Sequence, residues 1–241
     1  MAALQLLVLV AAIVVGIVSF GFGMTTMPFL LIWLEPVIAV EINLILTSVL
    51  FIVVSSQTWR FIDRSTFFAL LLGSLVGIPL GTYVAASASD SSLRLALTSV
   101  IIAIAMLGMV GRLRYLHRER LAAVPIGASY GFLNAGLALG GPLVALVALN
   151  QRWGRDRTRA MLSSFFLVTS VVGLASHAIG GLMGVQELRS GAIFIPALLT
   201  GAFIATRLVG RVDEALFRRL VLTVLLAASF GVLVREIVRL L

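Results

Sequence analysis

Apolar residues form long runs along this chain, and charged residues fall mainly between the runs. A helix needs roughly 20 apolar residues to cross ~30 Å of hydrocarbon, and most of the runs have that length. Membrane-spanning strands would instead give ~10-residue segments of alternating polarity, which are not visible in the sequence. The pattern predicts an all-α integral membrane protein with about eight hydrophobic segments, at 4–34, 37–59, 66–89, 93–111, 121–149, 161–183, 190–208 and 215–234.

The first and the fifth runs are too long for one span, and glycine and proline interrupt both of them. The first run contains Gly23 and then Pro28, and the fifth contains Gly141 followed by Pro142. Glycines followed by proline can end one helix and begin another, because proline is tolerated at the first position of a helix. We therefore expect each run to be broken into two half-helices, with Pro28 and Pro142 close to the start of the second half-helix.

The two interruptions lie at matching places in the two halves of the chain. Further along, Leu93–Thr98 in the first half is echoed by Arg218–Thr223 in the second. Internal similarity of this kind is typical of transporters built from repeats. We therefore expect one membrane domain over 1–241, with a first repeat over 1–111, an arginine-rich linker over 112–120 and a second repeat over 121–241.

Gly77 and Gly81 are four residues apart in the third run, so they lie on one face of a helix. Small residues at this spacing allow two membrane helices to pack closely. We interpret the pair as a packing face, and we expect Gly201 and Ala205 to be its counterpart in the second half.

Every one of the 18 cationic side chains is an arginine, and their distribution predicts how the broken runs sit. If both runs cross once, the loops on each side hold nine arginines. If both runs are re-entrant hairpins, one side holds 14 and the other four, the two repeats are inverted, and the positive-inside rule places both termini outside the cytoplasm. We therefore predict a multi-pass protein of the cell (inner) membrane whose cytoplasmic arginines are Arg60, Arg64, Arg112, Arg114, Arg118, Arg120, Arg152, Arg155, Arg157, Arg159, Arg207, Arg211, Arg218 and Arg219.

Composition excludes several other classes of protein. A chain that is 61% hydrophobic and 12% charged has too few charges to cover the surface of a soluble globule. The net charge of +8 comes from arginines between apolar runs, which form no continuous basic face for a nucleic acid. The chain has no cysteine, so it offers no disulfide and no thiolate metal site, and we expect neither a metal nor a cofactor.

The interrupted runs are the strongest indication of function. A helix that begins inside a membrane has backbone N–H groups without partners and a partial positive charge at that end, so it attracts an anion. Neither broken run contains a carboxylate. We therefore expect a midplane site for a small anion, formed by Gly21, Gly23, Thr25, Thr26, Ser129, Tyr130, Asn134, Gly140, Gly141 and Ser163, with Asn43, Thr47, Ser48 and Ser164 as further polar groups nearby.

Two ionisable residues in the apolar runs could relay protons. Glu41 lies at the start of the second run, where it is either a proton carrier or a solvated carboxylate at the membrane surface. His177 is the only histidine in an apolar run, and it is either a relay or an interfacial residue near the end of its segment.

Two other functions remain open on the residues alone. Gly127–Gly131 matches the Gly-x-Ser-x-Gly motif, so Ser129 with His177 as base would make an intramembrane serine hydrolase. The chain could also be a membrane scaffold subunit that transports nothing. A hydrolase would react with a serine-directed probe, and a scaffold would show no flux.

The glycine–proline segments also carry a family resemblance. Gly21–Leu30, its second-half echo Gly131–Leu143 and the segment Gly77–Gly81 resemble the sulfite exporter TauE/SafE family of membrane permeases over essentially the whole chain. The resemblance implies a secondary transporter, not an enzyme, that carries a small anion such as sulfite or an organosulfonate. Its expected partners are that anion and the lipid bilayer, and a homo-oligomer remains open.

Overall fold

A computed structural model describes residues 2–89 and 119–213, together with 91–93, 95–96, 99–100, 103, 215–217, 219–220 and 223. Within these residues every regular element is a helix, which confirms the all-α prediction. In chain order they are α1 (Ala2–Val18), α2 (Phe22–Trp33), α3 (Pro36–Thr58), η1 (Trp59–Phe61), α4 (Arg64–Ser87), α6 (Glu119–Leu137), α7 (Gly141–Asn150), α8 (Arg155–Ile179), α9 (Val185–Ala192) and α10 (Ile195–Val209). Most of the expected linker and of the runs at 93–111 and 215–234 lies outside the described residues.

Three of the described segments are long and apolar enough to cross a membrane alone: α3 with η1, α4 and α8, which have 26, 24 and 25 residues. The other apolar helices are shorter. α2 and α7 have 12 and 10 residues, so they extend about 18 and 15 Å, roughly half the hydrocarbon thickness. The two long runs are therefore broken, as their glycines and prolines predict.

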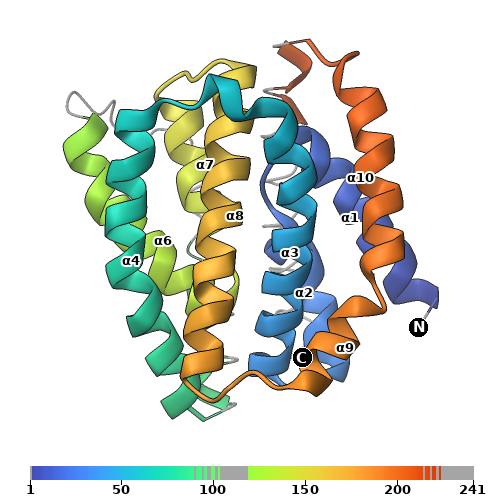
Figure 1. Ribbon diagram of the computed structural model, residues 1–241, viewed down its shortest axis with the longest axis vertical. Coiled ribbons are helices and arrows are strands. Elements are labelled where there is room, and N and C mark those ends of the chain that lie inside the picture. The colour runs from blue at the N-terminus through green and yellow to red at the C-terminus, as the bar shows by residue number, and fades with distance from the viewer. Residues whose placement is uncertain are drawn as a thin grey trace.

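The first broken run is a hairpin that returns to the end it came from (Figure 1). α1 runs in the same direction as α10, because Leu9 packs on Gly201 and Gly16 packs on Ala205 further along both helices. α2 then runs back along α3, where the Asn43 side chain bonds to Thr26.

The second broken run is also a hairpin, and it enters from the opposite end. α6 starts at the end of the molecule where α4 starts and α3 finishes, and α7 leads back to that end (Figure 1). The Trp153 Nε1–H after α7 donates to Glu119 Oε1, at the start of α6, over 2.9 Å. α3 and α8 lie antiparallel between the hairpins, since Ser55 meets Ser164 near one end while Glu41 meets His177 near the other.

The structure corrects the predicted role of Pro28. This residue lies inside α2, which begins six residues earlier at Phe22. The chain reverses where φ is positive, at Ser19 (63°) and Gly21 (93°), and a proline cannot adopt such a φ. Inside α2 the proline lacks the backbone N–H that would bond the Met24 carbonyl four residues earlier. Pro142, in contrast, occupies the first turn of α7 as predicted.

Glycines let α4 and α6 pack backbone to backbone. A Cβ on Gly73, Gly77 or Gly81 would lie 1.9–2.3 Å from the carbonyl oxygens of α6. The Gly77–Gly81 pair is thus a packing face, and Gly201 with Ala205 forms the equivalent contact between α10 and α1. α4 in the first half thus packs against α6, the first helix of the second half, and α10 in the second half packs against α1, the first helix of the first half.

A charged network joins the two halves at the arginine-bearing end. Arg157 Nη2 lies 2.9 Å from Asp63 Oδ2 and 2.8 Å from Glu119 Oε1, and its guanidinium lies over the Trp153 ring at 4.6 Å. Asp63 also caps α4 by accepting from the Ser65 and Thr66 N–H groups. Partial burial acts to raise the pKa of Asp63, but the Thr66 bonds, Arg157 and the Ser65 N–H outweigh it and hold that pKa below its ordinary value.

The α4–α6 contact can be tested with Gly77→Ala. In a helix interior this change normally stabilises by about 0.5–1 kcal/mol, but here the new Cβ would lie 2.0 Å from the Ala128 carbonyl oxygen. We expect a net loss of about 1–3 kcal/mol, seen as a lower thermal unfolding midpoint in detergent. Gly210→Ala is the matched control, since a Cβ there meets nothing within 4 Å. A Gly77→Ala protein as stable as wild type would contradict the close packing.

The Asp63 cap predicts a pH-dependent stability difference. Asp63→Ala removes the capping acceptor and should cost about 1 kcal/mol at neutral pH, measured by thermal unfolding. Because the folded pKa is depressed, this contribution is complete above the ordinary range of a carboxyl and disappears as the pH falls through the folded value. A difference that grows on acidification would show that the sign is wrong.

Candidate functional site

A small cavity lies where the two breaks meet at the centre of the molecule. Thr47 is the middle residue of α3, and Phe166 is next to the middle of α8, so the cavity is at mid-depth. Its volume is about 20 Å³, a little more than a water molecule needs. The lining residues are Gly21, Phe22, Gly23, Met24, Asn43, Thr47, Phe51, Tyr130, Asn134, Ala138, Gly141, Pro142 and Phe166.

The two breaks touch each other and have the same construction. Each is three residues long, 19–21 between α1 and α2 and 138–140 between α6 and α7. Each opens with a non-glycine residue in the left-handed region, Ser19 at 63° and Ala138 at 56°. A Cβ on Gly23 would lie 1.9 Å from the Ala138 carbonyl oxygen, and one on Gly141 would lie 3.7 Å from the Gly21 nitrogen. Glycine at position 23 is what allows this approach.

The starts of two half-helices therefore face one cavity. The first residues of α2 and of α7 are among its lining residues, and backbone N–H groups in a first turn have no intrahelical acceptor. Both helix dipoles place their partial positive charge at this point. None of the described lining residues is acidic, so nothing in the lining neutralises that charge. The geometry favours an anion.

Asn43 is held against the first break by a short chain of hydrogen bonds. Its Nδ2 donates to Thr26 Oγ1 over 2.6 Å, and that hydroxyl donates to the Phe22 carbonyl over 2.8 Å. Thr47 Oγ1 donates to the Asn43 Oδ1 over 3.3 Å. Thr26 thus positions Asn43 and does not line the cavity itself.

Asn134 provides the side-chain donor that this network leaves free. It comes from the last turn of α6, is 7% exposed and lines the cavity. Its Nδ2 finds no hydrogen-bond partner among the described residues. A buried donor left unpaired costs about 1–3 kcal/mol, so an acceptor in the cavity would be stabilised by this amide.

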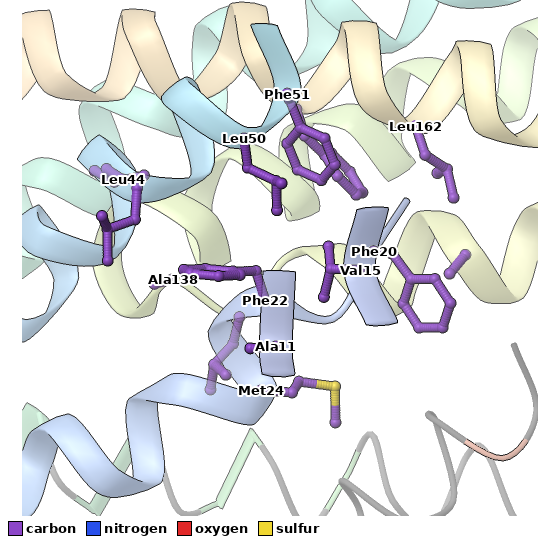
Figure 2. Packing of buried hydrophobic residues seen from close by; sticks show 14 of the residues in the cluster. Ala11, Val15, Phe20, Phe22, Met24, Leu44, Leu50, Phe51, Ala138 and Leu162 are labelled. Carbon is purple, nitrogen blue, oxygen red and sulfur yellow. The ribbon is translucent and has the colours of Figure 1, made fainter. Parts of the chain in front are cut away.

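One wall of the cavity is aromatic. The Tyr130 ring stacks on the Phe166 ring with centroids 5.1 Å apart and an interplanar angle of 2°, and Phe51 lies 5.6 Å from Phe166. Figure 2 shows Phe51 extending from α3 toward the side of the core where Phe22 lies. The sequence indicated Tyr130 but not the phenylalanines, because apolar residues in a membrane span are expected to face lipid or core alike. Their position at the middle of the spans is the signal that could have found them.

Several predicted site residues do not reach the cavity. The Thr25 hydroxyl donates back to the Gly21 carbonyl over 3.0 Å. Ser163 is buried at the arginine-bearing end beside Thr58, with 3.2 Å between the two hydroxyls. Gly140 lies behind Tyr130, where a Cβ would be 2.7 Å from the ring. None of these three residues is part of the cavity lining.

The geometry also separates Ser129 from His177. Ser129 is exposed on α6, within a helix instead of on the strand-to-helix turn that the motif needs. Its flanking glycines, Gly127 and Gly131, pack on the backbone of α4. His177 Nε2 is bonded to the Ala135 carbonyl oxygen at 2.9 Å. The serine–histidine pair of the hydrolase hypothesis is therefore not formed.

Glu41 and His177 are both fully buried and lie against each other. His177 Nδ1 is 3.5 Å from Glu41 Oε1 across the α3–α8 contact. Neither residue is at a solvated surface, so the interfacial interpretation of each is wrong. The sequence could not pair them, because they are 136 positions apart and come from different halves.

Arg159 is not in a solvated loop as its neighbours suggested. It lies in the first turns of α8 with 6% exposure, and its Nη2 donates to the Gly16 carbonyl over 3.3 Å. That carbonyl belongs to the last turn of α1, where a cation is favoured by the helix dipole.

The family described as Sulfite exporter TauE/SafE matches residues 4–232. No curated protein and no solved structure matches the chain.

The hydrogen bond between Asn43 and Thr26 can be tested by comparing substitutions at two adjacent positions, Thr26 and Thr25. Thr26→Val removes the hydroxyl that accepts from the buried Asn43 Nδ2 and should destabilise the protein by about 1–3 kcal/mol in thermal unfolding. Thr25→Val removes a hydroxyl that bonds only to its own helix and should have a much smaller effect. Equal effects of the two changes would show that Thr26 does not hold Asn43.

Proposed function

Because the chain belongs to the sulfite exporter TauE/SafE family, a family of membrane transporters, we propose that it is a secondary permease for a small oxyanion such as sulfite or an organosulfonate. The observation that carries this proposal is the meeting of two half-helix starts at one mid-depth cavity. Backbone N–H groups around Gly23 and Gly141 and the amide of Asn134 are the donors for the anion's oxygens.

The cavity is too small for the whole anion in this conformation. Sulfite has a sulfur and three oxygens, whereas about 20 Å³ accommodates little more than a water. The aromatic side chains of Phe22, Phe51 and Phe166 close the site, and binding requires them to move.

The matching breaks support a fold made of two inverted repeats, 1–111 and 121–241. Both breaks are three residues long and open with a left-handed residue, and the contacts of α4 with α6 repeat those of α10 with α1. Inverted repeats around a shared site are a common plan for alternating access. The two hairpins then serve as equivalent gates on the two sides.

The arginine-bearing end is the cytoplasmic side in this proposal. Among the described arginines, most lie where α3 ends, α4 and α6 begin, α7 joins α8 and α10 ends, whereas Arg189 lies on α9 at the other end. The positive-inside rule then places the start of α1 outside the cytoplasm, in a bacterial-type inner membrane.

Transport of radiolabelled sulfite into proteoliposomes tests the site. Asn134→Ala removes the free amide and should lower the uptake rate roughly tenfold, the effect of losing one hydrogen bond to a charged group. Gly141→Ala places a methyl group in the cavity at ordinary contact distances of 3.7–3.9 Å, so it should block uptake while leaving the fold intact.

Two controls separate the site from general damage. Gly154→Ala adds a methyl where nothing lies within 4 Å, and Thr25→Val removes a hydroxyl that bonds to its own helix. Both should retain wild-type uptake and thermal stability. If the Asn134 and Gly141 variants are folded and transport sulfite at the wild-type rate, the anion does not bind in this cavity.

A further inference from the structure

We propose that Glu41 and His177 form a proton site which is loaded together with the anion, so that one proton is carried in the same direction as each anion. This rests on the proposed permease function and adds the coupling ion. The pair lies outside the cavity lining and belongs to neither half-helix start.

The pair is a buried acid and base held close without a completed hydrogen bond. Both side chains are 0% exposed, and Nδ1 of His177 is 3.5 Å from Oε1 of Glu41. The two carboxylate oxygens of Glu41 and Nδ1 of His177 have no hydrogen-bond partner among the described residues. Buried polar atoms without a partner destabilise a folded membrane protein unless they share a proton or form an ion pair.

The contact with α6 fixes which nitrogen can exchange a proton. His177 Nε2 is 2.9 Å from the Ala135 carbonyl oxygen, and a carbonyl can only accept, so Nε2 carries a hydrogen. Ala135 is in the last turn of α6, where carbonyls lack intrahelical partners. Proton loading and release therefore take place at Nδ1 and at the Glu41 carboxyl.

The charge of the pair follows from how many protons it holds at these two positions. With one shared proton the pair is neutral, as an acid beside a neutral imidazole or as a carboxylate beside an imidazolium. With two it carries one positive charge, and with none it carries one negative charge. The partial negative charge at two helix C-termini favours the protonated pair, because His177 lies in the last turn of α8 and contacts the last turn of α6.

The pair is placed to sense an anion in the cavity. Ala135, which binds His177, is next to the lining residue Asn134, and Glu41 precedes the lining residue Asn43 by two positions, about 3 Å along the axis of α3. In a low-dielectric interior a bound anion favours the protonated pair and disfavours the negative one. Each ligand therefore raises the affinity for the other, which is the condition for transport in the same direction.

Other titratable groups that the structure describes do not share this role. α1, α2 and α7 carry none. On the remaining helices around the pair, Tyr130 is bonded to Thr169 and Glu119 to Arg157. At the far end of α8 from His177, Arg155 is paired with Asp156, and the buried Arg159 donates to the Gly16 carbonyl. The exposed titratable groups are Arg64 and Tyr83 on α4, Arg120 on α6, Arg189 on α9 and Arg207 on α10.

Methanesulfonate is a suitable probe, because it stays ionised across the working pH range and carries no proton of its own. Wild-type proteoliposomes, with the membrane potential clamped at zero, are given equal labelled methanesulfonate on both sides and an interior one pH unit more alkaline. Coupling of one proton to one anion predicts about tenfold accumulation at steady state, with acidification of an internal pH dye. Reversing the gradient should deplete the anion.

Glu41→Gln and His177→Gln test whether this pair binds the proton. Each keeps a polar side chain of similar size, and each should bring the accumulation ratio close to one. Glu35→Gln is the matched control, since it removes an exposed carboxylate at the start of α3, and it should keep the wild-type ratio. Thermal unfolding of each variant establishes that it is folded, and the two variants test the pair independently.

Each outcome is decisive. A wild-type ratio of one under both gradients, or anion movement opposite to the proton, overturns co-transport. About tenfold accumulation in a folded Glu41 or His177 variant overturns the assignment to this pair. Exchange of labelled for unlabelled methanesulfonate without a pH gradient tests the permease itself: exchange with a ratio of one overturns only the proton proposal, and no exchange overturns both.

Discussion

The fold depends on the contact between two stretches of unwound backbone at the centre of the molecule. Inside a membrane a backbone N–H or carbonyl without a partner is expensive, so non-helical backbone survives only where protein or a polar cavity surrounds it. Here the backbones of the two breaks pack against each other, since Gly23 approaches the carbonyl of Ala138 and Gly141 approaches the nitrogen of Gly21. The cavity lies at this contact, and α3 and α8 contribute Asn43, Thr47 and Phe166 to its lining.

The same breaks separate two kinds of electrostatic environment over a short distance. The starts of α2 and α7 are positive and face the cavity, whereas the end of α6 is negative and faces His177 through the Ala135 carbonyl. In the proposed mechanism, one interrupted helix therefore provides a place for an anion and a place for a proton, and none of the described lining residues is charged. Arg159, which binds a carbonyl at the end of α1, shows the same preference of a cation for a helix end.

Much of this could be predicted from the sequence, and what could not has physical causes. Apolar run lengths and paired glycines predicted the helices, both breaks and a pocket that includes Gly21, Asn134 and Gly141. The prediction that Pro28 lies near the start of α2 was wrong, because a helix can contain a proline in its interior. The chain reverses where φ is positive, and composition does not give φ. Thr25 and Ser129 were predicted to line the site and do not, because the direction of a hydroxyl depends on its rotamer and on the helix face that carries it. The Glu41–His177 pair requires the packing of α3 on α8, which only tertiary structure supplies.

The glycine contacts between α4 and α6 and between α1 and α10 have a consequence for motion. Helices whose backbones touch without intervening side chains have little freedom to slide or separate, so each pair is expected to behave as one stiff unit. Each unit contains one helix from either half of the chain. The boundary between moving parts would then cut across the duplicated halves, and the cavity would lie along that boundary.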